Sequence, residues 1–154
     1  RYFPSVEALL LDAPLDGEVA AADDLFRYDD STDPVARIDK AETMLHDMVY
    51  RNAAQLRLML AASLERKAKA SPDDVTPMRQ NRRTGLIDAA LAPARRQFTD
   101  AVYRKFGAAL ALVFGIESMV VFSDVLGIDE KAARKIKSWA MQAMIEAAKR
   151  ESKK

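Results

Sequence analysis

The longest apolar run in the chain extends from Thr99 to Gly127, where almost every residue beyond Lys105 is apolar or small. Such a run is too long for a strand and lacks an alternation of period two, so it predicts a buried helix. At about 1.5 Å per residue, this central helix has an expected length of roughly 40 Å. Thr99 is expected to cap its start and Gly127 to end it. A helix that is apolar nearly all round needs protein on every side, and we expect a second subunit to supply part of it.

Elsewhere in the chain, apolar residues recur at helical spacing, and capping residues mark where the helices begin. No stretch has the pattern of a strand, so the sequence predicts an all-α fold of about seven helices. The predicted helices are one after Ser5, one over 17–26, one from Asp33-Pro34 to a joint at Asn52, one over 53–69, one from Thr76-Pro77 to about Ala92, the central helix, and one from Asp129-Glu130 onward.

The central run also has the composition of a membrane span, but charged residues interrupt it. Glu117 and Asp124 leave it short of the roughly 20 apolar residues that a bilayer requires. The sequence shows no signal peptide, and with no cysteine it excludes a disulfide framework and a thiolate metal site. We therefore expect a cytoplasmic protein with no membrane partner.

The formal net charge of +1 conceals an uneven distribution of charge along the chain. Residues 1–48 include 4 basic and 12 acidic residues, a net charge of −8, whereas residues 49–154 include 20 and 11, a net charge of +9. An acidic first part is unsuited to contact with nucleic-acid phosphates. The basic excess is spread along the predicted helices, which is typical of a solvated face.

Few residues in the sequence are suited to catalysis. His46 is the single histidine, and its neighbours Glu42, Asp47 and Tyr50 do not have metal-ligand spacing. The sequence contains no glycine-rich phosphate loop and no nucleophile elbow. We expect His46 to be a surface or pocket-lining residue, and the protein to be no enzyme, with no catalytic residue, no metal and no cofactor.

Glu117 is the most informative polar residue of the central run, because a carboxylate inside an apolar helix is costly unless it is paired. Two interpretations stay open. In the first, Glu117 forms an intramolecular salt bridge, for which Arg57 and Arg82 are candidates. In the second, it is a polar anchor inside a ligand pocket.

Several stretches of the sequence resemble one protein family. The opening RYFPSVEALL resembles the junction in TetR/AcrR-type transcriptional regulators where the recognition helix of the helix-turn-helix ends and the regulatory domain begins. The stretches RNAAQLRLMLAASLE, RQNRRTGLIDAALAP and ALALVFGIESMVVFSDVLGIDEKAA resemble the regulatory domain of one branch of that family. The resemblance covers nearly the whole chain. It implies that residues 1–4 are the end of a DNA-binding domain and that residues 5–154 are a ligand-binding and dimerisation domain.

By this resemblance, the chain is the effector-sensing and dimerising part of a transcriptional repressor. A small molecule inside the helical domain would shift the spacing of two recognition helices across a homodimer. The two long C-terminal helices would form a four-helix bundle with those of the partner subunit, and operator DNA would be contacted only through the helix-turn-helix. A helical protein–protein interaction module without a ligand is the alternative. A small helical enzyme is disfavoured because no acid–base or metal constellation is found.

The expected effector is a small, mostly apolar molecule, because one face of the central helix combines aromatic bulk with one hydroxyl and one carboxylate. Thioethers from the preceding helices suit an adaptable apolar cavity. The candidate ligand-binding residues are Met48, Met59, Tyr103, Phe106, Leu110, Phe114 and Glu117.

The expected dimer interface uses the opposite face of the central helix, whose small residues let another helix approach closely, together with an alanine-rich stripe of the last helix. The candidate interface residues are Ala108, Ala111, Gly115, Ser118, Phe122, Ile136, Ala140, Ala143 and Met144.

Overall fold

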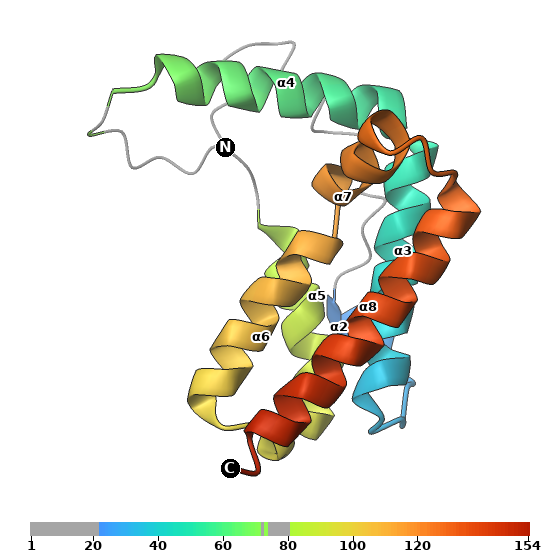
Figure 1. The fold of residues 1–154 in the computed structure, drawn as a ribbon, viewed down its shortest axis with the longest axis vertical. Helices are drawn as coiled ribbons and strands as arrows, with labels where there is room; N and C mark the ends of the chain where they lie inside the picture. The colour runs from blue at the N-terminus through green and yellow to red at the C-terminus, as the bar shows by residue number, and fades with distance from the viewer. Residues whose placement is uncertain (1–21, 72, 74–80) are drawn as a thin grey trace.

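The computed structural model describes residues 22–71, 73 and 81–154, and the regular structure within these ranges is entirely helical (Figure 1). The elements are α2 (Ala22–Phe26), α3 (Pro34–Arg51), α4 (Ala53–Lys69), α5 (Arg82–Leu91), the 3₁₀ helix η1 (Ala92–Gln97), α6 (Asp100–Val113), α7 (Ile116–Val120), the π-helix η2 (Val121–Val125) and α8 (Glu130–Glu151). The prediction of an all-α fold is confirmed for this part of the chain. The predictions for the opening residues and for a helix start at Thr76-Pro77 lie outside the described residues.

The longest helix of the described part of the molecule, α8, lies between two other helices. It packs against α6 on one side and α3 on the other, and α5 contacts both α3 and α6 (Figure 1). The core between these helices is apolar and nearly inaccessible to solvent, with Ile38, Leu110, Phe114 and Ile145 at 0% exposure. In contrast, α4 lies across one end of the others and contacts α3 and α7 (Figure 1).

The helix starts follow the capping residues that the sequence indicated. Asp33 accepts hydrogen bonds from the backbone N–H groups of Val35 and Ala36 at the start of α3, with Pro34 in its first turn. Thr99 caps α6, and Asp129 caps α8. Each cap satisfies backbone donors that the first turn of a helix leaves without a partner. The joint at Asn52 and the extent of α4 are also confirmed.

The prediction of one long central helix is wrong. The helix ends at Val113, a new helix begins at Ile116, and the two segments are bent by 49°. Gly115 lies at the break with φ +98°, a backbone conformation that glycine adopts readily and other residues rarely. Gly127 ends the second segment at φ +63°, as the sequence indicated. The expectation of two long C-terminal helices therefore holds for α8 alone.

The broken central run is not covered on every side within the chain. Leu112 and Val125 are 77% and 72% exposed, and Val121 and Leu126 are about half exposed. Within the described residues, no single helix is long and apolar enough to cross a bilayer. Only α6 and α7–η2 taken together, which are bent relative to each other, have the length and composition of a membrane-spanning segment.

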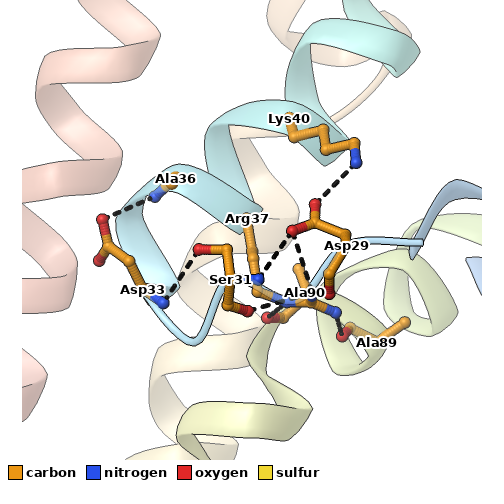
Figure 2. Close-up of polar contacts among 8 residues, drawn as sticks. All are labelled: Asp29, Ser31, Asp33, Ala36, Arg37, Lys40, Ala89 and Ala90. Atoms are coloured by element: carbon orange, nitrogen blue, oxygen red, sulfur yellow. Dashed lines mark hydrogen bonds and ion pairs between the residues drawn. The ribbon is translucent and has the colours of Figure 1, made fainter. Parts of the chain in front are cut away.

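Arg37 connects three segments of the described chain by hydrogen bonds: its own helix α3, the end of α5 and the loop before α3 (Figure 2). Its guanidinium donates hydrogen bonds to the carbonyls of Ala89 and Ala90 at the end of α5, both at 2.9 Å, and to those of Asp29 and Ser31 in the preceding loop. The side chain is 5% exposed, and the guanidinium also lies over the ring of Phe26 at 4.0 Å. Arg37 thus satisfies carbonyls that the end of a helix leaves without partners.

Candidate functional site

At the break between α6 and α7, one arginine from α5 contacts both helices. Arg83 donates from Nη1 to the carbonyl of Ala111 at 2.9 Å, and from Nη2 to both carboxylate oxygens of Glu117 at 3.0 and 2.8 Å. The Ala111 carbonyl lies in the last turn of α6, where intrahelical partners run out. Glu117 lies in the first turn of α7, where the helix dipole favours a negative charge.

The salt-bridge interpretation of Glu117 therefore has a partner in the structure, Arg83. The sequence suggested Arg57 or Arg82, but Arg57 forms its ion pair with Asp124 at 2.6 Å. The side chain of Glu117 is also 43% exposed, so it does not lie inside the apolar core. The expectation that Glu117 lies inside an apolar helix is therefore wrong, because this side chain is partly exposed while its neighbours Ile116 and Ser118 are buried.

The other candidate ligand-binding residues belong to the packed core or its edge. Phe106, Leu110 and Phe114 are at most 3% exposed, and Met48 is 7% exposed. Met59 and Tyr103 are partly buried against the same core. The hydroxyl of Tyr103 donates a hydrogen bond to Asp88 at 3.0 Å, and burial together with this bond raises the pKa of Tyr103 to about 12. The helices thus bring the apolar candidates together and place Glu117 apart from them.

The candidate dimer residues fall into two groups. On the broken central run, Ala108 is exposed, but Ser118 is 7% exposed and donates a hydrogen bond to the Gly115 carbonyl at 2.9 Å, so it lies inside the chain. Ala111, Gly115, Phe122 and, on α8, Met144 are half-buried.

On α8, an apolar stripe faces away from the described core. Its most exposed member is Trp139 at 72%, beside Ile136 at 39%. The residues that α8 buries instead are Ala133, Lys137, Met141, Ile145 and Ala148. We define the α8 stripe as Ala132, Ile136, Trp139, Ala140, Ala143 and Ala147.

A buried polar cluster, which sequence reasoning missed, lies where α3, α7 and α8 meet. Glu42 and Lys137 are each 2% exposed and form an ion pair between α3 and α8. The Lys137 ammonium also donates to the hydroxyl of Ser118 at 3.4 Å. A buried charge is tolerated only when it is paired and hydrogen-bonded, and this pair meets that condition.

His46 extends the cluster along α3. It is 1% exposed, so of the two expected positions, at the surface or lining a pocket, the surface position is wrong. Its Nδ1 lies 3.7 Å from Glu42 Oε1, and its Nε2 lies 3.8 Å from Oε1 of Glu130 at the start of α8. Its ring stacks on Tyr50 with centroids 4.4 Å apart. Among the described residues, neither nitrogen of His46 nor the hydroxyl of Tyr50 has a hydrogen-bond partner.

The pKa values of the cluster reflect its burial and its charges. Burial, the largest effect, raises the pKa of Glu42, but His46 and Lys137 beside it outweigh that effect and hold the pKa below its ordinary value. Burial lowers the pKa of Lys137, although the Glu42 carboxylate opposes the change. Burial and the nearby carboxylates Glu130 and Glu42 raise the pKa of Tyr50. The ion pair with Lys137 and the contact with His46 therefore favour the charged form of the Glu42 carboxylate against the cost of burying it.

Glu130 connects this cluster to solvent. Its side chain is 51% exposed, and it lines an open hollow of about 440 Å³ together with Asp129, Lys131 and Arg134. None of the candidate ligand-binding residues lines this hollow. In the part of the chain that the structure describes, no group of three or more metal-binding side chains comes together.

One signal in the sequence was available for part of this cluster. Glu42 and His46 are four residues apart, which places them on one face of a helix that is otherwise apolar at Ile38, Ala41 and Leu45. The sequence contains no comparable indication that Lys137 is buried. The regular apolar stripe of α8 instead predicts that the opposite face of that helix is the buried one.

Comparison with known proteins identifies no relative of this chain. No family model, no curated protein and no solved structure matches it.

Proposed function

We propose that the chain is the effector-sensing and dimerising part of a transcriptional regulator of the TetR type. The all-helical architecture fits this proposal, as does the resemblance of the sequence. The observation that carries it is the α8 stripe, because a large aromatic residue 72% exposed among alanines needs a partner surface.

The occupant that we propose for the α8 stripe is a second copy of this chain. Small residues let two helices approach closely, and a twofold axis would set the α8 stripe of one protomer against that of its partner. The exposed apolar residues Leu112, Val121, Val125 and Leu126 on the neighbouring helical segments would extend the contact. An interface of this kind resembles a four-helix bundle built from α6, α7 and α8 of both protomers.

A second candidate function is a helical protein–protein interaction module without a ligand. The packing of Phe106, Leu110 and Phe114, all at most 3% exposed, favours this alternative. An effector at these residues would have to displace core side chains, whereas an interaction module would use the α8 stripe alone.

The test uses Trp139, the single tryptophan of the sequence, as the probe. With rising protein concentration, its fluorescence emission should shift to shorter wavelength as the indole leaves water, and light scattering should give twice the 17.1 kDa mass of one chain. Thermal melts with a library of small apolar molecules then test for an effector, since a ligand that binds only the native state raises the melting temperature.

The three outcomes separate the proposals. A dimer that at least one library member stabilises supports the regulator. A dimer that no member stabilises favours the interaction module. A protein that remains monomeric at tens of micromolar, with Trp139 emission independent of concentration, would overturn the proposed dimer and with it both uses of the α8 stripe.

A further inference from the structure

We propose that the buried ion pair between Glu42 and Lys137 determines which face of α8 packs inward, and thereby keeps the α8 stripe outward as an interaction surface. The helix has two faces that are suited to burial. Among the residues that α8 buries, Lys137 is the charged one, whereas the α8 stripe has no charged member. By hydrophobicity alone, Ile136 and Trp139 favour burial of the α8 stripe instead.

The ion pair opposes this alternative orientation of α8. Glu42 and Lys137 are each 2% exposed, and their charged groups are in direct contact between α3 and α8. A rotation of α8 that buried Trp139 would carry Lys137 away and leave the Glu42 carboxylate buried without this cation. Breaking a buried pair in this way is strongly destabilising, because an uncompensated charge stays in the low-dielectric interior. The alternative orientation therefore loses more at Glu42 than it gains at Trp139.

Lys137 fixes the orientation of α8 against two helices rather than one. Its ammonium also donates a hydrogen bond to the Ser118 hydroxyl of α7 at 3.4 Å, and that hydroxyl donates to the Gly115 carbonyl at 2.9 Å. Arg134, one turn earlier on α8, pairs with Asp47 of α3, but these side chains are 33% and 45% exposed, so solvent screens their attraction. The choice of face therefore depends on the buried pair.

This role differs from a contribution to stability. Replacing both partners of a buried ion pair by apolar residues of similar volume is often neutral or stabilising. Such a replacement does remove the penalty on the alternative orientation, since no charge is then left buried without its partner. The inference concerns a single chain and does not rest on the proposed dimer, although the same pair would keep the α8 stripe available to a second copy.

The test is the double variant Glu42→Met with Lys137→Met, which replaces the pair by two apolar side chains of similar length. We expect it to remain folded, with a urea midpoint no lower than that of wild type. The readout is acrylamide quenching of Trp139, the single tryptophan, at a dilution where light scattering gives the 17.1 kDa mass of one chain. In wild type the indole is 72% exposed and should be quenched readily. In the double variant α8 should bury either face, and with both orientations equally populated the quenching constant falls about twofold.

Two control variants separate loss of the pair from substitution as such. The charge-reversed variant, Glu42→Lys with Lys137→Glu, keeps an ion pair between α3 and α8 and should be quenched like wild type. Lys105→Met with Glu151→Met removes an exposed ion pair between α6 and α8, and it should also leave the quenching unchanged.

Three results would overturn the inference. A double variant that stays folded with Trp139 as accessible as in wild type would show that α8 keeps its orientation without the pair. A double variant that no longer folds would show that the pair is needed for stability rather than for the choice of face. Reduced quenching in the charge-reversed variant would show that an intact pair does not hold Trp139 outward. None of these results bears on the proposed dimer, which is tested by its dependence on protein concentration.

Discussion

At the scale of single residues, two arginines hold backbone carbonyls that the helices leave unpaired. Arg37 donates hydrogen bonds to carbonyls at the end of α5 and in the loop before α3, and Arg83 donates to a carbonyl at the end of α6. The contacts with the ends of α5 and α6 do not follow from sequence periodicity, because the carbonyls there lie more than 25 residues away from the arginine in the chain. The sequence could predict the caps next to each helix, such as Asp33 and Thr99, since a cap and its helix are adjacent.

Arg37→Ala should be among the most destabilising substitutions in the described chain. It removes a buried charged donor from four carbonyls, two of them at 2.9 Å, and leaves these acceptors without that partner. We expect a loss of about 3 kcal/mol in the free energy of unfolding. Arg27→Ala is the control, because that arginine is 60% exposed and pairs with Asp24 on the surface. It should change the stability by less than about 1 kcal/mol in the same urea titration.

Glu117→Gln tests the role of the carboxylate at the α6–α7 break. Because the Glu117 side chain is 43% exposed, solvent screens its ion pair with Arg83, and the loss of stability should stay below about 1 kcal/mol. Arg83→Ala should cost more, about 1–2 kcal/mol, since it also removes the donor to the Ala111 carbonyl.

Thermal melts with and without apolar ligands separate the two interpretations of Glu117. If Glu117 anchors an effector, Glu117→Gln abolishes a ligand-induced rise in melting temperature that wild type shows. A loss of stability above about 3 kcal/mol from Glu117→Gln alone would contradict the half-exposed position of this ion pair.

At the scale of the helices, the sequence predicted starts, joints and extents well but missed the bend. The joint at Asn52 and the residues of α4 agree with the expectation, because local propensity and capping decide them. The break at Gly115 was missed because the apolar pattern of the central run is the same on both sides of it. Composition alone does not distinguish a helical glycine such as Gly107 from one that adopts a positive φ.

These two glycines give a matched pair of substitutions with opposite expected signs. Gly115→Ala forces an alanine to φ +98° and brings its Cβ to 3.3 Å from Arg83 Nη2, so it should destabilise the protein by about 1–3 kcal/mol. Gly107→Ala lies inside α6 with open space around the new methyl group and should stabilise the helix by about 0.5–1 kcal/mol. Urea unfolding of both variants checks the prediction. Equal effects at the two positions would show that the break does not persist in solution.

At the scale of the whole molecule, the sequence predicted the fold class and an apolar face on the last helix. It could not predict which face of α8 the chain itself buries, because Lys137 occupies the centre of that face. A buried lysine becomes acceptable only through Glu42 on another helix, which is information that a one-dimensional pattern does not contain. The sequence likewise left a surface position open for His46, because Glu130, one of the residues beside its ring, comes from another helix.

The final prediction concerns the assembly. Ala140→Arg places a long charged side chain in the α8 stripe, and in a twofold dimer the two copies of that charge would act on one interface. We expect the variant to be a monomer or an aggregate by light scattering, with Trp139 emission that no longer depends on protein concentration. Gln142→Arg is the control, because it adds the same charge to an exposed position of α8 outside the α8 stripe and should leave the dimer intact. If both variants remain dimers with Trp139 buried, the interface lies on another surface of the molecule. If both dissociate, added charge rather than the α8 stripe is responsible.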